Sequence, residues 1–405
     1  VAARIFPCAT GKRDKKVFRL FCDLADPVDP IKLQEALEIA IHDFPIFKYT
    51  LKKGFFWYYL EESDLEAKVK KEEPHYPAIY EKDYEGLLFN VSYYGNRINV
   101  DVYHALADGS GVSAFIRCLV LYYLKLAHPA ELAATTALVH DSSITQGLAD
   151  SFAYHADNNP GVCKNKAKKV YHLRGERINN DALSLIEGTT SVKKILQLSR
   201  KHQSTITAVL STALLLAFAQ QMRIKQRKTP VVVSVPINLR NHFSSASSRN
   251  FFSVIAIAHC FSEGIPSFEA LLPQITAQLE KETAPEKLRF AVNRFIDLVD
   301  NPLLRLLPLS LKDFGMRIGY FIGKRRETTS LSNMGQINMP KECAPYIHKF
   351  GICISTPHLQ LCTISYLDTL SLVFSSTYES HEIQKNFFRI LSKLGLDLEI
   401  DSNTP

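Results

Sequence analysis

A six-residue segment, His104–Gly109, lies where one periodic pattern of apolar residues gives way to another. In the seven residues that end at Tyr103, apolar and polar side chains alternate, which is the period of a half-buried strand. After the segment, apolar residues recur every three or four positions, as they do along an amphipathic helix. The chain is therefore predicted to pass directly from strand to helix, with His104 at the strand end and Asp108 or Ser110 as the helix cap.

An imidazole at such a junction can reach into a cleft and take a proton from a substrate hydroxyl or amine, because its pKa is close to neutral. Two plainer interpretations fit the same residues: His104 as a hydrogen-bonded structural residue, and Asp108 as an ordinary helix cap. A metal site shared by the two is disfavoured, because Gly109 breaks the helix and no second His or Cys lies nearby in the sequence. No metal is therefore expected.

The six residues resemble the HxxxDG motif of a superfamily of acyl-transferring proteins. This superfamily includes chloramphenicol acetyltransferase (CAT), condensation domains of nonribosomal peptide synthesis, plant BAHD acyltransferases and bacterial alcohol acetyltransferase-like proteins. Other segments resemble further family motifs, in family order: Asp26–Leu37, Phe44–Phe47, Val233–Arg240, Arg249–Phe252 and Ser330–Gly335. The resemblance runs from about residue 16 to residue 335, which is most of the chain.

This sequence differs from two branches of the superfamily at positions typical of their motifs. Tyr103 precedes the motif histidine at a position where condensation domains usually carry a second histidine. The single-histidine branches, and among them the bacterial alcohol acetyltransferase-like proteins, are therefore the nearer relatives. The triplet Asp313–Gly315 has no tryptophan after it and precedes the Ser330–Gly335 motif, so it is interpreted as a chance match to the BAHD sequence DFGWG.

The resemblance implies an α/β fold of two CAT-like domains, each a two-layer α+β lobe, around a central cleft or tunnel. A chain of 405 residues agrees with two domains, since single cores seldom exceed about 250 to 300 residues. We expect an N-terminal domain over 1–160 that carries the motif, a crossover linker over 161–180, and a C-terminal domain over 181–405. Asn, Pro, Gly and Lys gather near the crossover, which favours a solvated linker over a site for carrier phosphates.

Periodicity predicts the other elements. Strands are expected at 16–24, 46–51, 54–61, 87–94, 97–103, 231–235, 252–260, 328–332, 350–355, 360–367 and 370–377. A helix is expected to begin at Pro30, with Asp29 as its cap, and another after Gly109. Further helices are expected at 190–202, 204–222, 266–283, 285–299, 310–323 and 380–394. The aromatic run Phe55–Tyr59 could line an acyl tunnel, although alternation along a strand directs half of its side chains into the core.

The resemblance also implies an acyltransferase that moves groups other than aminoacyl groups. The donor would be a thioester, either acyl-CoA or an acyl carrier protein, and the acceptor a small alcohol or amine. His104 is expected to act as the general base, which contributes about 10² to 10⁴ in rate, and no acyl-enzyme is required. The thioester is a co-substrate, and no permanently bound cofactor is expected.

Asp108, Gly109 and Arg240 are expected to support this site rather than to react. The carboxylate of Asp108 lies past a bend and needs a buried partner, for which Arg240 is the candidate. Gly109 is expected to permit the tight backbone that starts the helix, without a side chain that would block the cleft. Three further residues are candidates for the oxyanion site or the cleft: Ser332, Asn333 and Asn250. A turn-forming role is the alternative for the two asparagines.

Two other functions remain open: a condensation-like catalyst of carrier-tethered substrates in trans, and a non-catalytic protein that binds acyl thioesters. The net charge of +7 comes from 48 Lys and Arg against 41 Asp and Glu, which fits a mixed surface and favours an acidic ligand only weakly. The sequence has no long basic run interleaved with aromatic residues and no zinc-ligand spacing. Nucleic acid is therefore not an expected partner.

The eight cysteines are scattered without a CxxC pair, as expected for reduced thiols in a cytoplasmic protein. No charged and then apolar leader opens the chain, so export is not predicted. The uncharged stretch Gln203–Met222 contains eight Ser, Thr and Gln residues, which is too polar for a membrane span of about 20 residues. A buried helix capped by Ser204 is favoured over a stable membrane span.

Overall fold

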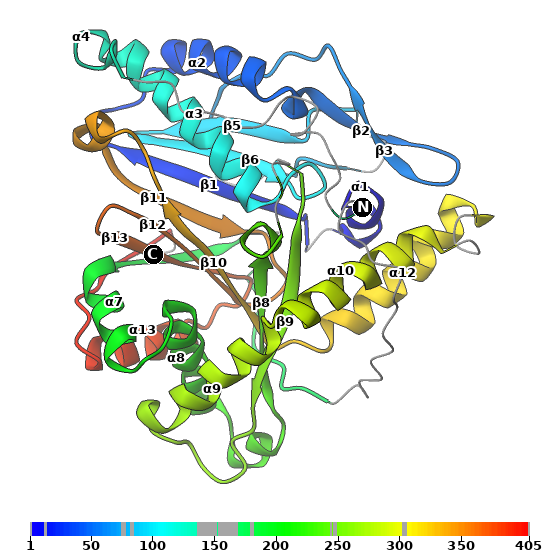
Figure 1. Ribbon diagram of the computed structural model, residues 1–405, viewed down its shortest axis with the longest axis vertical. Helices are drawn as coiled ribbons and strands as arrows, with labels where there is room; N and C mark the ends of the chain where they lie inside the picture. Colours follow the sequence, from blue (N-terminus) through cyan, green and yellow to red (C-terminus); the bar gives the residue numbers. More distant parts are fainter. Residues whose placement is uncertain are drawn as a thin grey trace.

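The computed structural model describes residues 2–11, 14–73, 78–81, 85–135, 152, 169–178, 182–243, 245, 249–301 and 306–403. Half of the expected crossover lies outside these residues, namely 161–168 and 179–180. The chain forms two mixed α/β layers, each with its own sheet and its own apolar core (Figure 1).

The first sheet has five strands in the order β11-β1-β6-β5-β4. They are β11 (Ile347–Ile354), β1 (Val17–Leu24), β6 (Arg97–Tyr103), β5 (Phe89–Tyr94) and β4 (Lys70–Lys71). Two helices, α2 (Pro30–Asp43) and α3 (Gly109–Ala127), contact each other and lie along one face of this sheet (Figure 1). As predicted, Asp29 caps α2 by accepting from the backbone N–H of Ile31 at 2.9 Å, with Pro30 at the first helical position.

The second sheet has seven strands in the order β14-β7-β13-β12-β10-β8-β9. They are β14 (Glu399–Ser402), β7 (Ser184–Ser191), β13 (Thr369–Ser376), β12 (Gln360–Tyr366), β10 (Thr329–Ile337), β8 (Val231–Asn238) and β9 (Phe252–His259). Its helices include α7 (Val192–Lys201), α8 (Ile206–Gln221), α9 (Phe268–Glu282) and α13 (Glu382–Lys393). The other elements are α1 (Ala2–Ala9), α4 (Pro129–Leu132), α10 (Pro285–Asp300), α12 (Leu309–Lys324), η1 (Pro45–Lys48), β2 (Tyr49–Lys53), β3 (Tyr58–Glu62), η2 (Ile224–Lys228), η3 (Leu239–Asn241) and η4 (Lys341–Tyr346).

Helix α8 is buried over the whole stretch from Ala208 to Ala219, as its uncharged sequence predicted. Its cap is Thr205, not Ser204: the Thr205 hydroxyl accepts from the Ala208 N–H at 3.2 Å. The Ser204 hydroxyl instead shares a hydrogen bond of 2.8 Å with Thr276 on α9. The predicted cap was therefore wrong by one residue, because a neighbouring helix provides a partner for Ser204.

Gly109–Ala127 (α3) is the one described helix that is long and apolar enough to cross a membrane by itself, and 56% of its most apolar window is buried inside the protein. The helices α7 and α8 reach the same criterion only as a pair bent by 86°. Since buried core helices commonly meet this test, α3 is explained by its packing in the first core.

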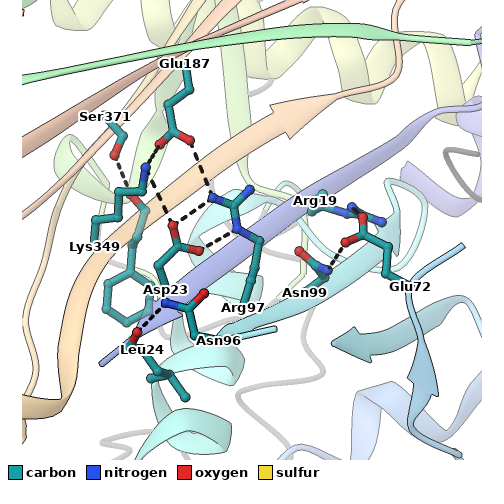
Figure 2. A network of polar contacts seen from close by, with 11 residues as sticks. Arg19, Asp23, Leu24, Glu72, Asn96, Arg97, Asn99, Glu187, Lys349 and Ser371 are labelled. Atoms are coloured by element: carbon teal, nitrogen blue, oxygen red, sulfur yellow. Dashed lines mark hydrogen bonds and ion pairs between the residues drawn. The ribbon is translucent and has the colours of Figure 1, made fainter. Parts of the chain in front are cut away.

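Strand β11 joins the two halves of the chain. It follows β10 in the sequence, yet it pairs antiparallel with β1 and so completes the first sheet. Its Lys349 lies 2.9 Å from Glu187 on β7 of the second sheet, while Arg97 on β6 pairs with Asp23 on β1 at 2.5 Å. Figure 2 shows these four side chains as one network, in which Glu187 also faces Arg97 at 3.6 Å. Strand pairing thus joins the two halves of the chain within the first sheet, and ion pairs with Glu187 link the first sheet to the second.

Several predicted boundaries were displaced. The strand expected at 46–51 begins only at Tyr49, because Pro45 starts the short 3-10 helix η1. The strand expected at 54–61 begins at Tyr58, because Gly54 and Trp57 close the hairpin turn through a hydrogen bond of 3.0 Å. Two strands of the second sheet, β7 and β14, and helix α1 were not predicted at all.

Candidate active site

The loop between β6 and α3 places His104 between the two layers. Its backbone N–H donates to the carbonyl of Lys16 at 2.8 Å, which ties the end of β6 to the start of β1. The imidazole stacks on Phe6 of α1, with ring centres 4.8 Å apart and planes at 10°. Phe18 and Phe252 lie against it at 4.9 and 5.5 Å. No sequence pattern predicts these aromatic neighbours, because they come from three segments that are distant in the chain.

Asn250 contacts both the side chain and the backbone of His104. Its Nδ2 donates to the His104 carbonyl at 2.9 Å, and its Oδ1 lies 3.1 Å from Nδ1 of the imidazole. Because the carbonyl accepts only from the amide nitrogen, the amide oxygen must face the ring and accept from Nδ1–H. This assigns the proton to Nδ1 and leaves an unprotonated lone pair on Nε2. None of the described residues forms a hydrogen bond with Nε2.

Burial lowers the pKa of His104 below its ordinary value, and the charge of Lys16 lowers it further, against an opposing contribution from Asp108. A low pKa keeps the imidazole neutral near pH 7. The fixed tautomer and the neutral ring are the two properties that a general base requires.

Asp108 is buried and its carboxylate is fully engaged by the protein. It caps α3 by accepting from the Gly111 N–H at 3.1 Å, and it accepts from the Phe251 N–H at 2.8 Å. Arg240 Nη1 lies 2.7 Å from Asp108 Oδ2, which is the ion pair expected from the sequence. Arg240 also donates to the carbonyl of Arg249, so one guanidinium ties the start of α3 to two segments of the second layer. These three contacts hold the carboxylate in place between the start of α3 and the second layer.

Gly109 acts through its missing side chain and not through an unusual backbone conformation. Its backbone is not in the left-handed region, so no unusual backbone conformation demands glycine there. A Cβ at this position would instead lie 2.5 Å from both Sδ and Cε of Met334 on β10. Gly109 therefore leaves room for a side chain of the opposite layer, at the point where α3 begins.

A cavity of about 650 Å³ opens at this junction, and His104 is part of its wall. The start of α3, η3 and the ends of β8 and β10 line it, with α9 at one side. Its polar lining is mostly uncharged, and it includes Ser110, Thr207, Asn238, Ser332 and Gln360. Such a wall suits an uncharged polar chain better than a highly charged group.

The three candidates for the oxyanion site or the cleft take different positions. Ser332 and Asn333 both line the cavity with His104, whereas Asn250 is not among the described residues of its wall. The Asn333 amide donates to Thr207 at 3.1 Å and accepts from the Gly335 N–H at 3.0 Å, as a turn-forming asparagine does. Ser110, which accepts from Asn238 at 2.9 Å, is a further hydroxyl of this wall that the sequence analysis considered only as a cap.

Comparison with models of protein families and with curated proteins finds no match for this sequence. Solved structures share its fold over nearly the whole chain. TRI101 from Fusarium graminearum, in complex with coenzyme A and T-2 mycotoxin, is 11% identical with a TM-score of 0.63, over 94% of this chain and 95% of that one. The first condensation domain of the calcium-dependent antibiotic synthetase is 13% identical with a TM-score of 0.60, over 94% and 91%.

Polyketide synthase associated protein 5 from Mycobacterium tuberculosis is 14% identical with a TM-score of 0.58, over 96% and 97% of the two chains. The trichothecene 15-O-acetyltransferase TRI3 from Fusarium sporotrichioides is 12% identical with a TM-score of 0.57, over 97% and 93%. These likenesses establish the fold: two CAT-like α/β layers, as the sequence predicted, shared with acetyltransferases and condensation domains.

Proposed function

We propose that this chain, which has the fold of acetyltransferases and condensation domains, is an acyltransferase that moves an acyl group from a thioester to a small alcohol or amine. The observation that carries the proposal is the hydrogen bond between Asn250 Oδ1 and His104 Nδ1 at 3.1 Å. This hydrogen bond supports a neutral imidazole with a free Nε2, and His104 is part of the cavity wall.

In the proposed reaction, the acceptor hydroxyl or amine attacks the thioester carbonyl while its proton passes to Nε2 of His104. The resulting tetrahedral oxyanion collapses and expels the thiolate, and the imidazolium returns its proton to that thiolate. Bond formation and cleavage balance without an acyl-enzyme or a redox partner. Because the thioester is already activated, the protein contributes chiefly the base and the close approach of two bound substrates.

Ser332 is the proposed donor to the oxyanion, with Ser110 as the second hydroxyl of the same wall. Ser110 already accepts from Asn238, so its own O–H remains available to donate. A donor aimed at the developing charge contributes about 10² to 10³ in rate. Asn250 is assigned a positioning role instead, since its amide is occupied by His104.

The donor is proposed to be acyl-CoA or an acyl carrier protein. TRI101 binds coenzyme A in the solved complex, which supports a coenzyme A thioester. The mostly uncharged polar wall of the cavity matches the chemistry of the amide-rich pantetheine arm that both donors share. The two-domain division at 161–180 is part of this proposal, with the cavity at the contact between the halves.

The proposal is tested by mass spectrometry of released coenzyme A and acylated product. Short, medium and long acyl-CoA donors are incubated with pooled alcohols and amines, with the wild-type protein and His104→Ala. We expect turnover by the wild type and a loss of at least about 10²-fold in the variant, with thioester binding nearly unchanged. A matched control is His242→Ala, which alters another histidine of the cavity wall. Equal turnover by His104→Ala and the wild type would refute the assignment.

A condensation reaction on carrier-tethered substrates is the second candidate, because a condensation domain matches the fold over 94% of this chain. The same assay with a carrier-tethered amine in place of the free alcohols and amines separates the two, because only the condensation reaction requires a tethered acceptor. Folded protein that binds thioesters and gives no turnover with either kind of acceptor would favour a binding role.

A further inference from the structure

Helix α12 presents its apolar side chains outward. Five large apolar residues recur at the spacing of one helix face and are exposed by 46 to 67%: Leu311, Phe314, Ile318, Phe321 and Ile322. An ordinary surface helix turns such a stripe toward the core and its polar residues toward water. In α12 this arrangement is reversed.

Polar contacts fix the orientation of α12. The ammonium of Lys312 is buried, donates to the carbonyl of Phe56 at 3.0 Å and lies 3.9 Å from the ring centre of Trp57. The adjacent Asp313 accepts from the hydroxyl of Tyr58 at 2.8 Å. One turn before the end of the helix, Tyr320 donates to the carboxylate of Asp14. Rotating the apolar stripe inward would break these contacts and leave buried charges unpaired.

Neighbouring segments extend the apolar surface. Phe55, at the turn between β2 and β3, is 74% exposed, and its carbonyl accepts from the Leu309 N–H at 3.0 Å. Phe56 is 43% exposed beside it, and Leu306, just before α12, is 76% exposed. We call these three residues and the five on α12 the α12 face. In Figure 1, α12 and the β2–β3 hairpin both reach the right-hand edge of the molecule.

The charge around the α12 face is positive. Residues 309–327 contain five basic and two acidic residues. Both acids have partners. Asp313 accepts from the hydroxyl of Tyr58, and Glu327 forms an ion pair with Lys324 at 2.8 Å. Arg317, Arg325 and Arg326 are exposed at the margins. Arg325 lies 4.3 Å over the ring of Phe321. Exposed phenyl rings interspersed with arginines match the apolar interior and the anionic headgroups of a lipid surface.

We propose that the α12 face docks this protein on an anionic lipid bilayer. The helix lies in the plane of the interface, the rings of Phe314, Phe321 and Phe55 enter the acyl region, and the arginines contact headgroup phosphates. This interaction does not depend on the proposed acyl transfer. It is a surface attachment and needs no membrane span.

Flotation of the full chain with vesicles tests the proposal. Two compositions are used, phosphatidylcholine alone and phosphatidylcholine with phosphatidylglycerol. We expect flotation with the anionic vesicles, weakened by added salt because the arginine contribution is screened. The double variant Phe314→Ser/Phe321→Ser should bind at least about tenfold more weakly. The matched control is Ile31→Ser on α2, where an apolar side chain is 79% exposed away from α12.

A helix of another protein copy is the competing occupant, because Gly315, Gly319 and Gly323 form an open row beside the α12 face. Gly319→Leu separates the lipid surface from the second protein copy, because we expect it to block close helix packing but to leave lipid binding intact. Loss of flotation in Gly319→Leu, or a concentration-dependent dimer in light scattering that Phe314→Ser/Phe321→Ser abolishes, would overturn the proposal. Wild-type protein that floats with neither composition would overturn it as well. Melting temperatures within a few degrees of the wild type confirm that each variant is folded.

Discussion

Asn250 holds His104 from two sides, with its amide nitrogen on the His104 carbonyl at 2.9 Å and its amide oxygen on Nδ1 at 3.1 Å. The residues are 146 positions apart in the sequence. The contact fixes the tautomer of the imidazole and its place at the seam between the two layers.

Replacing Asn250 by Ala should lower kcat by about 10- to 100-fold, because the ring loses the acceptor that keeps the proton on Nδ1. Replacing it by Asp should raise the pKa of His104, since a carboxylate beside Nδ1–H favours the imidazolium. The acid limb of the kcat/KM profile should then move to higher pH. A purely structural role would lower activity in both variants and leave the limb in place.

The wild-type pH profile follows from the same site. Burial lowers the pKa of His104 from its ordinary value of 6.5. A general base works in its neutral form, so activity should rise as the pH increases through this lowered pKa. The midpoint of the acid limb of kcat/KM should therefore lie below 6.5, and it should be absent from the residual activity of His104→Ala. A midpoint above 6.5 would contradict the role of the buried ring.

Breaking the ion pair of Asp108 and Arg240 should destabilise the fold. Arg240→Met leaves the buried Asp108 carboxylate with two backbone N–H donors and no countercharge, which costs about 3 to 5 kcal/mol in the free energy of unfolding. The measurement is urea denaturation. Asp108→Asn combined with Arg240→Met should recover part of the loss, because no unpaired charge remains. A double variant as unstable as the sum of the singles would show that the charges do not interact.

Gly109→Ala should impair catalysis through Met334. The added methyl group would lie 2.5 Å from the Met334 thioether, so that side chain must move at the cavity wall. We expect a raised KM and a lower kcat. Gly109→Ala combined with Met334→Ala should restore activity toward that of Met334→Ala alone. Gly315→Ala is the matched control, because a Cβ at Gly315 meets no atom within 4 Å.

The sequence determined those features that depend on neighbours in the chain. The strand at 97–103 and the helix that begins at Gly109 have the bounds that periodicity predicted. The strand is buried on both faces rather than on one, because its polar Asn99 and Asp101 are covered by Glu72 and Arg19. Asp29 and Asp108 cap their helices because a carboxylate accepts from N–H groups two or three residues onward. The HxxxDG resemblance led to the correct fold, which the solved structures share.

Only the tertiary structure decided the features that depend on contacts across the chain. Strand β7 was missed because Glu187 and Gly188 interrupt its apolar pattern, yet the ring of Phe388 occupies the space above Gly188. The pairing of β11 with β1, the contact of Asn250 with His104, and the approach of Met334 to Gly109 each join segments more than 100 residues apart. Local periodicity shows that a side chain is buried but not which partner it meets. The chemistry of His104 therefore follows from how the two layers pack.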